Sequence, residues 1–324
     1  MRQRTSRPAM VRIAIAGAGG FAQILAQHIS QTTEHALIVL SRRPQPELQE
    51  YCPECQVAVV DYNNITNLAY TLQGANLVIS TIGGNEQLNL IDAARRARVN
   101  VFVPSEFEGD LNHRPEHDDP LDTRDSRSAL RFLESWSQST SHRLRYTVFS
   151  CGVFMERFAP GGLQMYGIGA GSGVQGPDDY LVNIQEARAE IIPTNSNGRP
   201  ARISLTSVYD VAQFIMAAIE LGLDNWPKEF RMRGDSLTVQ ELVETCSNAL
   251  GVPIRMVTRH YQEVETQAEA SQQVGDWSQY YYFHRLLQTA NGRYHVRQPN
   301  LNEATQVQPQ TFRQWLENVW ASGA

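Results

Sequence analysis

The stretch IAIAGAGGFAQ constrains the fold more than any other part of the sequence. Residues 11–16 are apolar and rich in branched side chains, which is typical of a strand buried on both faces. The glycines that follow predict a tight turn into a helix. As GxGxxA the motif is complete, because Gly17 makes the turn, Gly19 lets a backbone approach a pyrophosphate and Ala22 lets the helix pack on the strand. As GxxGxxG it fails at Gln23.

Strand and helix patterns then alternate along the first half of the chain. The segments expected after the first helix are strands at residues 36–40, 56–60, 75–84 and 99–107, with helices at 65–72 and 85–98. This alternation predicts an α/β fold with a doubly wound parallel sheet. Right-handed crossovers place the carboxyl ends of its strands on one edge, where a ligand is expected.

The expected domain organisation follows from this pattern. Residues 1–10 are predicted to be a disordered tail, and residues 11–152 a Rossmann domain that binds a dinucleotide. Residues 153–324 are predicted to be a smaller α+β region that binds substrate, with some segments rejoining the sheet. The boundary lies near the strand that ends at Ser150.

The composition of the chain limits the kinds of partner that it can bind. A net charge of −6 argues against nucleic acid, because phosphate contacts need an excess of clustered Lys and Arg. No apolar run approaches the roughly 18 residues of a membrane span, and the first ten residues have no signal-peptide core. We therefore expect a cytoplasmic protein that binds neither nucleic acid nor membrane, as a monomer or homodimer.

The four cysteines are too few and too scattered for a disulfide framework. Cys52 and Cys55 form a CxxC pair, but a zinc site needs four ligands and no partner pair lies at a suitable spacing. A thioredoxin-like site needs its first cysteine at a helix start after a strand. The pair is interpreted as an ordinary loop without a metal or redox role.

The end of the second predicted strand distinguishes two dinucleotides. An NAD site has an acid there to bind the ribose 2′-hydroxyl, whereas this chain has Ser41, Arg42 and Arg43. A guanidinium matches a phosphate and Ser41 adds a hydroxyl, so NADP(H) is the favoured cofactor. The alternative is that both arginines are solvated loop residues.

Several motifs together resemble the NmrA-like and isoflavone-reductase-like family of atypical short-chain dehydrogenases. They are GAGGFAQ, VLSRR, VISTIGGNEQLNLIDAARRA, VFVPSEFEGD and YTVFSCGVFMERF, and the resemblance extends over nearly the whole chain. It implies an NADPH-binding sheet with a C-terminal substrate region. The residues expected around the cofactor, from the motifs above and from this resemblance together, are Gly17, Gly19, Gly20, Phe21, Ala22, Ser41, Arg42, Arg43, Thr81, Ile82, Gly83, Gln87, Pro104, Ser105, Glu106 and Phe107.

The chain departs from this family at two positions. The family usually has glycine where Gln23 stands; its amide either donates to a phosphate oxygen or faces solvent, and we expect solvent. The family's reductases carry a lysine near Ser126 or Ser128, but the only lysine of this chain is Lys228. Arginine cannot replace that lysine as an acid, because it stays protonated near neutral pH.

Four residues remain as catalytic candidates, namely Glu106, His113, Asp125 and Ser126. Histidine is a common proton donor, which makes His113 a candidate, although its acidic neighbours and a following proline are more typical of a solvated turn. Hydride transfer to an imine or iminium carbon needs no alkoxide to be protonated in the same step. The missing lysine therefore leaves that substrate class open.

An apolar substrate pocket is predicted from the aromatic and methionine residues of the later loops. These are Phe107, Phe154, Met155, Phe158 and Tyr166, for which ordinary core packing is the alternative. The sequence thus predicts an NADPH-dependent oxidoreductase acting on a hydrophobic metabolite with an imine, iminium or enone-like group, with a cyclisation or rearrangement as a further step. The alternative is an NADP(H)-sensing regulator without turnover.

Overall fold

The structure is a computed structural model that describes residues 10–169 and 180–321. Most of the predicted N-terminal tail thus lies outside the described residues. The chain divides into two compact units, which are described separately. Unit 1 comprises Met1–Glu106, Arg124–Val148 and Ala212–Phe230, and unit 2 comprises Phe107–Thr123, Phe149–Val211 and Arg231–Ala324.

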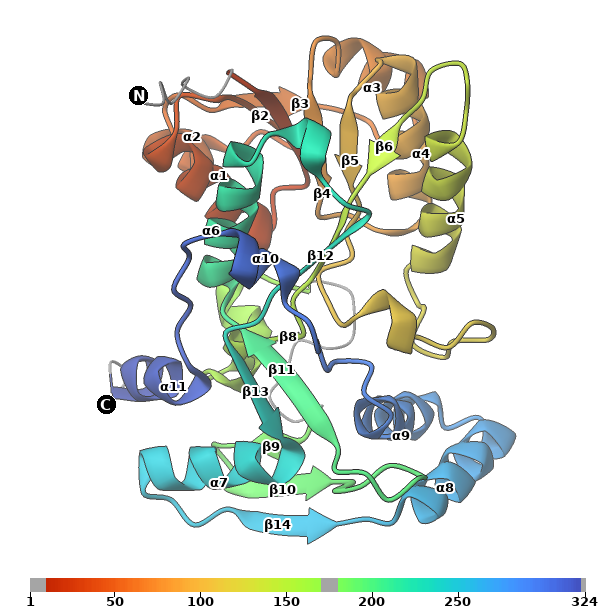
Figure 1. Cartoon of the computed structure of the whole chain (residues 1–324), viewed down its shortest axis with the longest axis vertical. Helices are drawn as coiled ribbons and strands as arrows, with labels where there is room; N and C mark the ends of the chain where they lie inside the picture. Colours follow the sequence, from red (N-terminus) through yellow and green to blue (C-terminus); the bar gives the residue numbers. More distant parts are fainter. Residues whose placement is uncertain (1–9, 170–179, 322–324) are drawn as a thin grey trace, which may run out of the picture. The chain divides into compact units, whose positions relative to one another are not determined.

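Unit 1 is built on a six-stranded parallel sheet (Figure 1). Its strands, in spatial order, are β3 (Gln56–Val59), β2 (Ala36–Ser41), β1 (Arg12–Ala16), β4 (Leu77–Ser80), β5 (Val101–Val103) and β6 (Arg145–Tyr146). The order reverses between β1 and β4, which is the switch point of a doubly wound sheet. The prediction of a doubly wound α/β fold is confirmed. Among the described residues, no strand after β6 joins this sheet.

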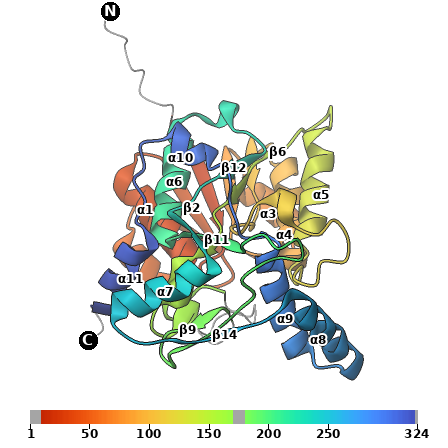
Figure 2. The same ribbon diagram turned by 60° about the horizontal axis from the view of Figure 1, so that its bottom comes forward.

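Helices cover both faces of this sheet because its strands are apolar on both sides. Ala14 and Ala16 of β1 face the core shared with α3 (Ile65–Thr71), α4 (Gly84–Arg96) and α5 (Ser126–Ser137). On the opposite face lie α1 (Gly20–Thr32) and the part of α6 (Val208–Glu220) that belongs to unit 1 (Figures 1 and 2). This arrangement leaves the carboxyl ends of the strands at one edge.

Unit 1 also contains α2 (Pro46–Tyr51), which ends at a disulfide between Cys52 and Cys55. The prediction of an ordinary loop missed this bond. Two of the points at which the chain passes from one unit to the other lie within β7 (Val148–Ser150) and β12 (Glu229–Arg231), which pair with each other.

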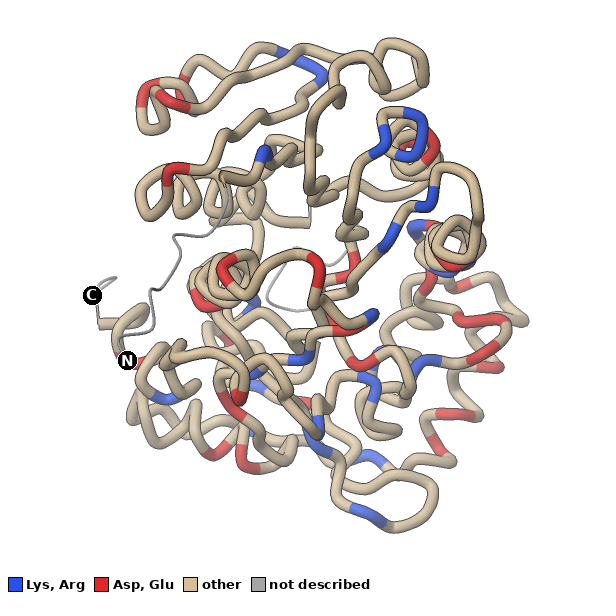
Figure 3. Tube along the Cα trace, turned by 45° about the horizontal axis from the view of Figure 1, so that its top comes forward, with Lys and Arg blue, Asp and Glu red and all other residues tan. Residues whose placement is uncertain are grey.

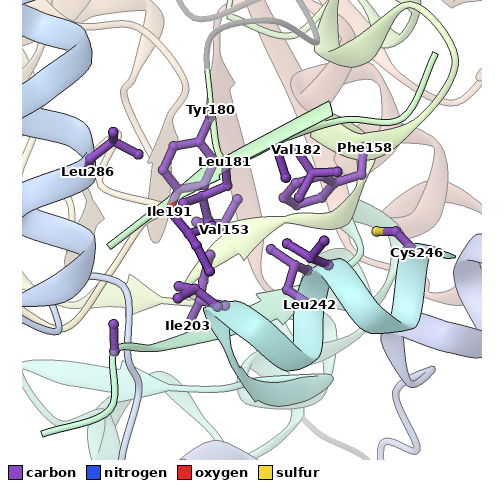
Figure 4. Packing of buried hydrophobic residues seen from close by; sticks show 14 of the residues in the cluster. Val153, Phe158, Tyr180, Leu181, Val182, Ile191, Ile203, Leu242, Cys246 and Leu286 are labelled. Atoms are coloured by element: carbon purple, nitrogen blue, oxygen red, sulfur yellow. The ribbon is translucent and has the colours of Figure 1, made fainter. Parts of the chain in front are cut away.

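Unit 2 combines two small mixed sheets with helices. The sheets are β14 (Arg255–Thr258), β10 (Arg188–Ile191) and β9 (Val182–Asn183), and β13 (Asp235–Thr238), β11 (Arg202–Thr206) and β8 (Val153–Phe154). The helices are α7 (Val239–Leu250), α8 (Tyr261–Val274), α9 (Trp277–Ala290), α10 (Asn300–Ala304) and α11 (Phe312–Ala321). Side chains from both sheets and from α7 and α9 meet in one apolar core (Figure 4).

Charge is distributed evenly over the described chain. Figure 3 shows Lys and Arg positions interspersed with Asp and Glu positions in both units. No helix among residues 10–169 and 180–321 is long and apolar enough to cross a lipid bilayer.

Candidate functional site

The turn after β1 accepts only glycine at position 17. Gly17 has φ +106°, a conformation that side chains disfavour. A Cβ added there would lie 2.3 Å from the Thr81 Oγ1 atom. The Gly17 amide donates to the Leu40 carbonyl of β2 at 2.9 Å. The tight turn predicted at Gly17 agrees with this geometry, and the structure adds its close contact with the ends of β2 and β4.

The amino terminus of α1 directly follows the glycine turn. Gly19 is the N-cap residue and makes no side-chain capping bond, and the first turn of the helix contains no acid. Gly20 begins the helix, and the next two residues of its first turn, Phe21 and Ala22, are buried. An uncapped helix amino terminus attracts anions through its N–H groups and its dipole. The glycine turn therefore has the features of a pyrophosphate site.

The Gln23 side chain turns back onto the loop before its helix. Its side chain is half-buried, and its amide donates to the Ala18 carbonyl at 3.1 Å. The expectation that it faces solvent is wrong, because Gln23 is long enough to turn back over the loop that precedes its helix. It stabilises the glycine turn where the family usually has glycine.

Tyr62 lies beneath the glycine turn and was not anticipated from the sequence. Its hydroxyl donates to the Leu40 carbonyl at 2.8 Å and accepts from the Gly17 amide at 3.0 Å. Burial raises the pKa of Tyr62, so the phenol stays neutral. No local motif indicates this role, since Gly17 and Tyr62 are 45 residues apart.

The segment after β2 carries two exposed arginines. Ser41 is buried, and its hydroxyl oxygen accepts from the Arg43 amide at 3.3 Å and from Gln45 Nε2 at 2.9 Å. Ser41 thus shapes this turn. The Arg42 side chain is 72% exposed and approaches Glu86 at 3.3 Å, whereas the Arg43 guanidinium has no partner within the described part of the chain.

The segments after β4 and β5 are connected by a buried amide. Thr81 donates to the Ala16 carbonyl at 2.9 Å, and Ile82 and Gly83 follow it to the start of α4. Gln87 of α4 is buried, and its Oε1 accepts from the Ser105 amide at 2.7 Å. This bond fixes the backbone beside Pro104. Gln87 therefore positions the segment at Pro104 and Ser105 that is predicted to lie near the nicotinamide.

The four catalytic candidates are divided between the units. In unit 1, Glu106 is 2% exposed, and Asp125 is an exposed N-cap of α5 with φ +55° and no capping bond. Ser126 begins α5. In unit 2, His113 places its Nδ1 3.6 Å from Asp110 Oδ2.

The only lysine of the chain is used in an ion pair. Lys228 Nζ donates to both carboxylate oxygens of Glu134 in α5, at 2.7 and 2.8 Å. The Tyr146 hydroxyl donates to the same carboxylate at 2.7 Å. These bonds, that from Lys228 foremost, lower the pKa of Glu134 to about 2. Lys228 is therefore not a substitute for the absent family lysine.

In unit 2, the loop that follows β5 is anchored by buried ion pairs. Arg293 donates to Glu108 at 2.7 Å and to Asp119 at 2.6 Å, and Arg114 Nε lies 3.2 Å from Glu108. Burial alone would raise the pKa of Glu108, but the two guanidinium groups outweigh it and hold this pKa below its usual value. Arg114 and Arg293, together with Glu108 and Asp119, are called the loop anchor below.

Two of the five predicted substrate residues belong to the core. Met155 and Phe158 are fully buried in unit 2, and Phe158 packs edge-to-face on Phe312 with ring centroids 5.4 Å apart (Figure 4). For both residues core packing, the alternative interpretation, is the correct one. Phe107 and Phe154 are half-buried.

Tyr166 is the fifth predicted substrate residue, and it packs partly buried against the same core. A cavity of about 200 Å³ in unit 2 is formed by β9, β10 and β14 with Tyr180 and Tyr282. None of the five predicted substrate residues lines this cavity.

These features define the class of protein. The reversal of strand order between β1 and β4, the glycine turn and the uncapped α1 are those of a Rossmann-type dinucleotide-binding protein. The two arginines in place of an acid after β2 fit a dinucleotide with a 2′-phosphate.

Comparison with known proteins gives the family. Residues 10–281 match the model of the NmrA-like family, and the chain belongs to this family. The predicted resemblance is thus confirmed. The oxidoreductase BOA1 of Botryotinia fuckeliana is 24% identical over 262 residues, which cover 75% of this chain and 77% of that protein.

Solved structures share the fold. An isoflavone reductase crystal structure has a TM-score of 0.69 at 16% identity, covering 96% of this chain and 99% of that one. The leucoanthocyanidin reductase–NADPH complex from Vitis vinifera has a TM-score of 0.68 at 16% identity, with the same coverage. At such identities, these likenesses show the fold alone.

Proposed function

We propose that the chain is an NADP(H)-dependent reductase of a hydrophobic small molecule that contains an imine, iminium or enone-like group. The similar proteins support the reductase class, since one is named an oxidoreductase and another was solved with NADPH. The coenzyme supplies a hydride when bound. The glycine turn and α1 hold its pyrophosphate, and Arg42 and Arg43 bind its 2′-phosphate.

The ion pair between Lys228 and Glu134 is the observation on which the choice of substrate class rests. Positions 126 and 128 are serines, and the ammonium group of the only lysine, Lys228, is paired with Glu134. Ketone reduction creates an alkoxide that needs a proton in the same step. An iminium carbon that receives a hydride gives a neutral amine directly, with one C–H bond formed and the C=N π electrons returned to nitrogen.

Purified protein incubated with NADPH tests this proposal. We expect a cyclic iminium salt to oxidise NADPH measurably faster than a ketone of matching shape, as followed by the absorbance of the reduced coenzyme. Equal rates for the two compounds would contradict the inference that the missing family lysine favours an iminium substrate over a ketone. Mass analysis of the product tests the further step: a plain amine alone would exclude a coupled cyclisation or rearrangement.

The second candidate function is an NADP(H) sensor without turnover. The same absence of an ammonium group at the start of α5 favours it. Tight NADPH binding without oxidation by any imine, iminium or enone would support the sensor and contradict the reductase.

A further inference from the structure

Arg124 lies against the start of α4. A Cβ added at Gly83 would be 2.6 Å from the Arg124 Nε atom and 2.9 Å from its Nη2 atom, so the guanidinium occupies space that only glycine leaves free. The Arg124 carbonyl also accepts from the Gly84 amide at 2.9 Å. Backbone and side chain of Arg124 therefore both reach the segment that follows β4.

The described residues offer the Arg124 guanidinium no acceptor. Arg124 is exposed, and within residues 10–169 and 180–321 no carboxylate or carbonyl binds its side chain. By contrast, Arg95, in the last turn of α4, binds Asp92 at 2.9 Å. A guanidinium carries five N–H donors in a rigid plane, and those of Arg124 remain available to a ligand.

The strand order assigns Arg124 to one half of the coenzyme. Arg42 and Arg43 follow β2, on one side of β1, whereas Gly83 follows β4 on the other side (Figure 1). A dinucleotide lies across the switch point with its adenosine half on the β2 side. Its nicotinamide half therefore extends over the end of β4, where Arg124 lies.

We propose that Arg124 binds the nicotinamide half of NADP(H), by donating to the ribose hydroxyls or to the phosphate on that side. This inference rests on the proposed coenzyme site. Because arginine stays protonated, Arg124 holds and orients this half but cannot act as the proton donor. It is a coenzyme-binding residue that neither the glycine motif nor the residues after β2 indicate.

Calorimetry with two ligands tests the proposal. NADPH contains both halves, whereas adenosine 2′,5′-bisphosphate contains only the adenosine half. We expect Arg124→Gln to weaken NADPH binding about tenfold, the effect of one charge-assisted contact, and to leave binding of the bisphosphate unchanged. Retained bisphosphate binding also shows that unit 1 is folded. Arg124→Lys should recover part of the NADPH affinity.

Arg131→Gln is the matched control, since Arg131 is also an exposed arginine and belongs to α5. It should bind both ligands as the wild type does. Unchanged NADPH binding by Arg124→Gln, or equal weakening of both ligands, would overturn the inference. Failure of the wild type to bind either ligand would overturn the coenzyme site itself. If Arg124→Gln weakens NADPH binding but the wild type turns over no substrate, the role of Arg124 in coenzyme binding stands and only the proposed reductase activity is contradicted.

Discussion

The arginines at the carboxyl edge of unit 1 and those of the loop anchor in unit 2 differ in burial and in partners. Arg43 and Arg124 are exposed, and neither side chain has a partner among the residues that the structure describes. The Arg293 side chain is only 4% exposed, and it binds two carboxylates. The same residue type thus occurs in two opposite environments.

The difference follows from desolvation. A buried guanidinium is tolerated only with counter-ions, so Arg293 requires Glu108 and Asp119. An exposed guanidinium keeps its water and needs no partner, which leaves its donors free for a ligand. The comparison therefore separates arginines that hold the loop after β5 from arginines that are available to bind phosphate.

Loss of Arg293 should have the largest effect on stability. Arg293→Met leaves Glu108 and Asp119 buried without their main counter-ion, and we expect the free energy of unfolding to fall by about 3–5 kcal/mol. Urea unfolding followed by circular dichroism measures this. Arg43→Met is the control, with an expected change within about 0.5 kcal/mol. Similar losses of unfolding free energy in the two variants would contradict the distinction between the buried, paired arginines and the exposed ones.

Glu156 sharpens the comparison because it is a buried carboxyl group for which the described residues supply no cationic partner. Its carboxylate accepts from the Ser207 hydroxyl at 2.8 Å and from the Val208 amide at 3.0 Å. Burial raises the pKa of Glu156 to about 7, from an ordinary value of 4.5. The folded state therefore binds a proton that the unfolded state releases between these values.

The sign of the pH dependence follows. Glu156 contributes stability that is fully present below about pH 4.5 and is lost as the pH rises to about 7, on the order of 3 kcal/mol. Unfolding at pH 5 and pH 8 should show a larger fall for the wild type than for Glu156→Gln, whose amide does not ionise. The same fall in both proteins would contradict this assignment.

The architecture of unit 1 was predictable because its signals are local. The strand, glycine turn and helix around Gly17 are adjacent in sequence, and the two arginines directly follow a strand. Tyr62 and Arg124 were not predictable, because the folded sheet brings each of them to a glycine from a distant segment. Met155 and Phe158 were misjudged, since pocket and core residues share one composition.

The smallest effect is expected from Tyr62, a neutral buried group. Tyr62→Phe removes one hydrogen-bond partner of Gly17, whose amide keeps its bond to Leu40. We expect a loss of about 1 kcal/mol in the free energy of unfolding. Tyr70→Phe, at an exposed tyrosine, should show no loss. A loss as large as that of Arg293→Met would mean that the glycine turn depends on Tyr62 alone.

The central claim is that the arginines after β2 select a coenzyme with a 2′-phosphate. Calorimetry of NADPH and NADH with the wild type and with the double variant Arg42→Gln, Arg43→Gln tests it most directly. We predict that the wild type prefers NADPH and that the double variant loses this preference, through NADPH binding weakened about a hundredfold while NADH binding is kept. A wild type without preference, or a double variant that retains it, would contradict the account.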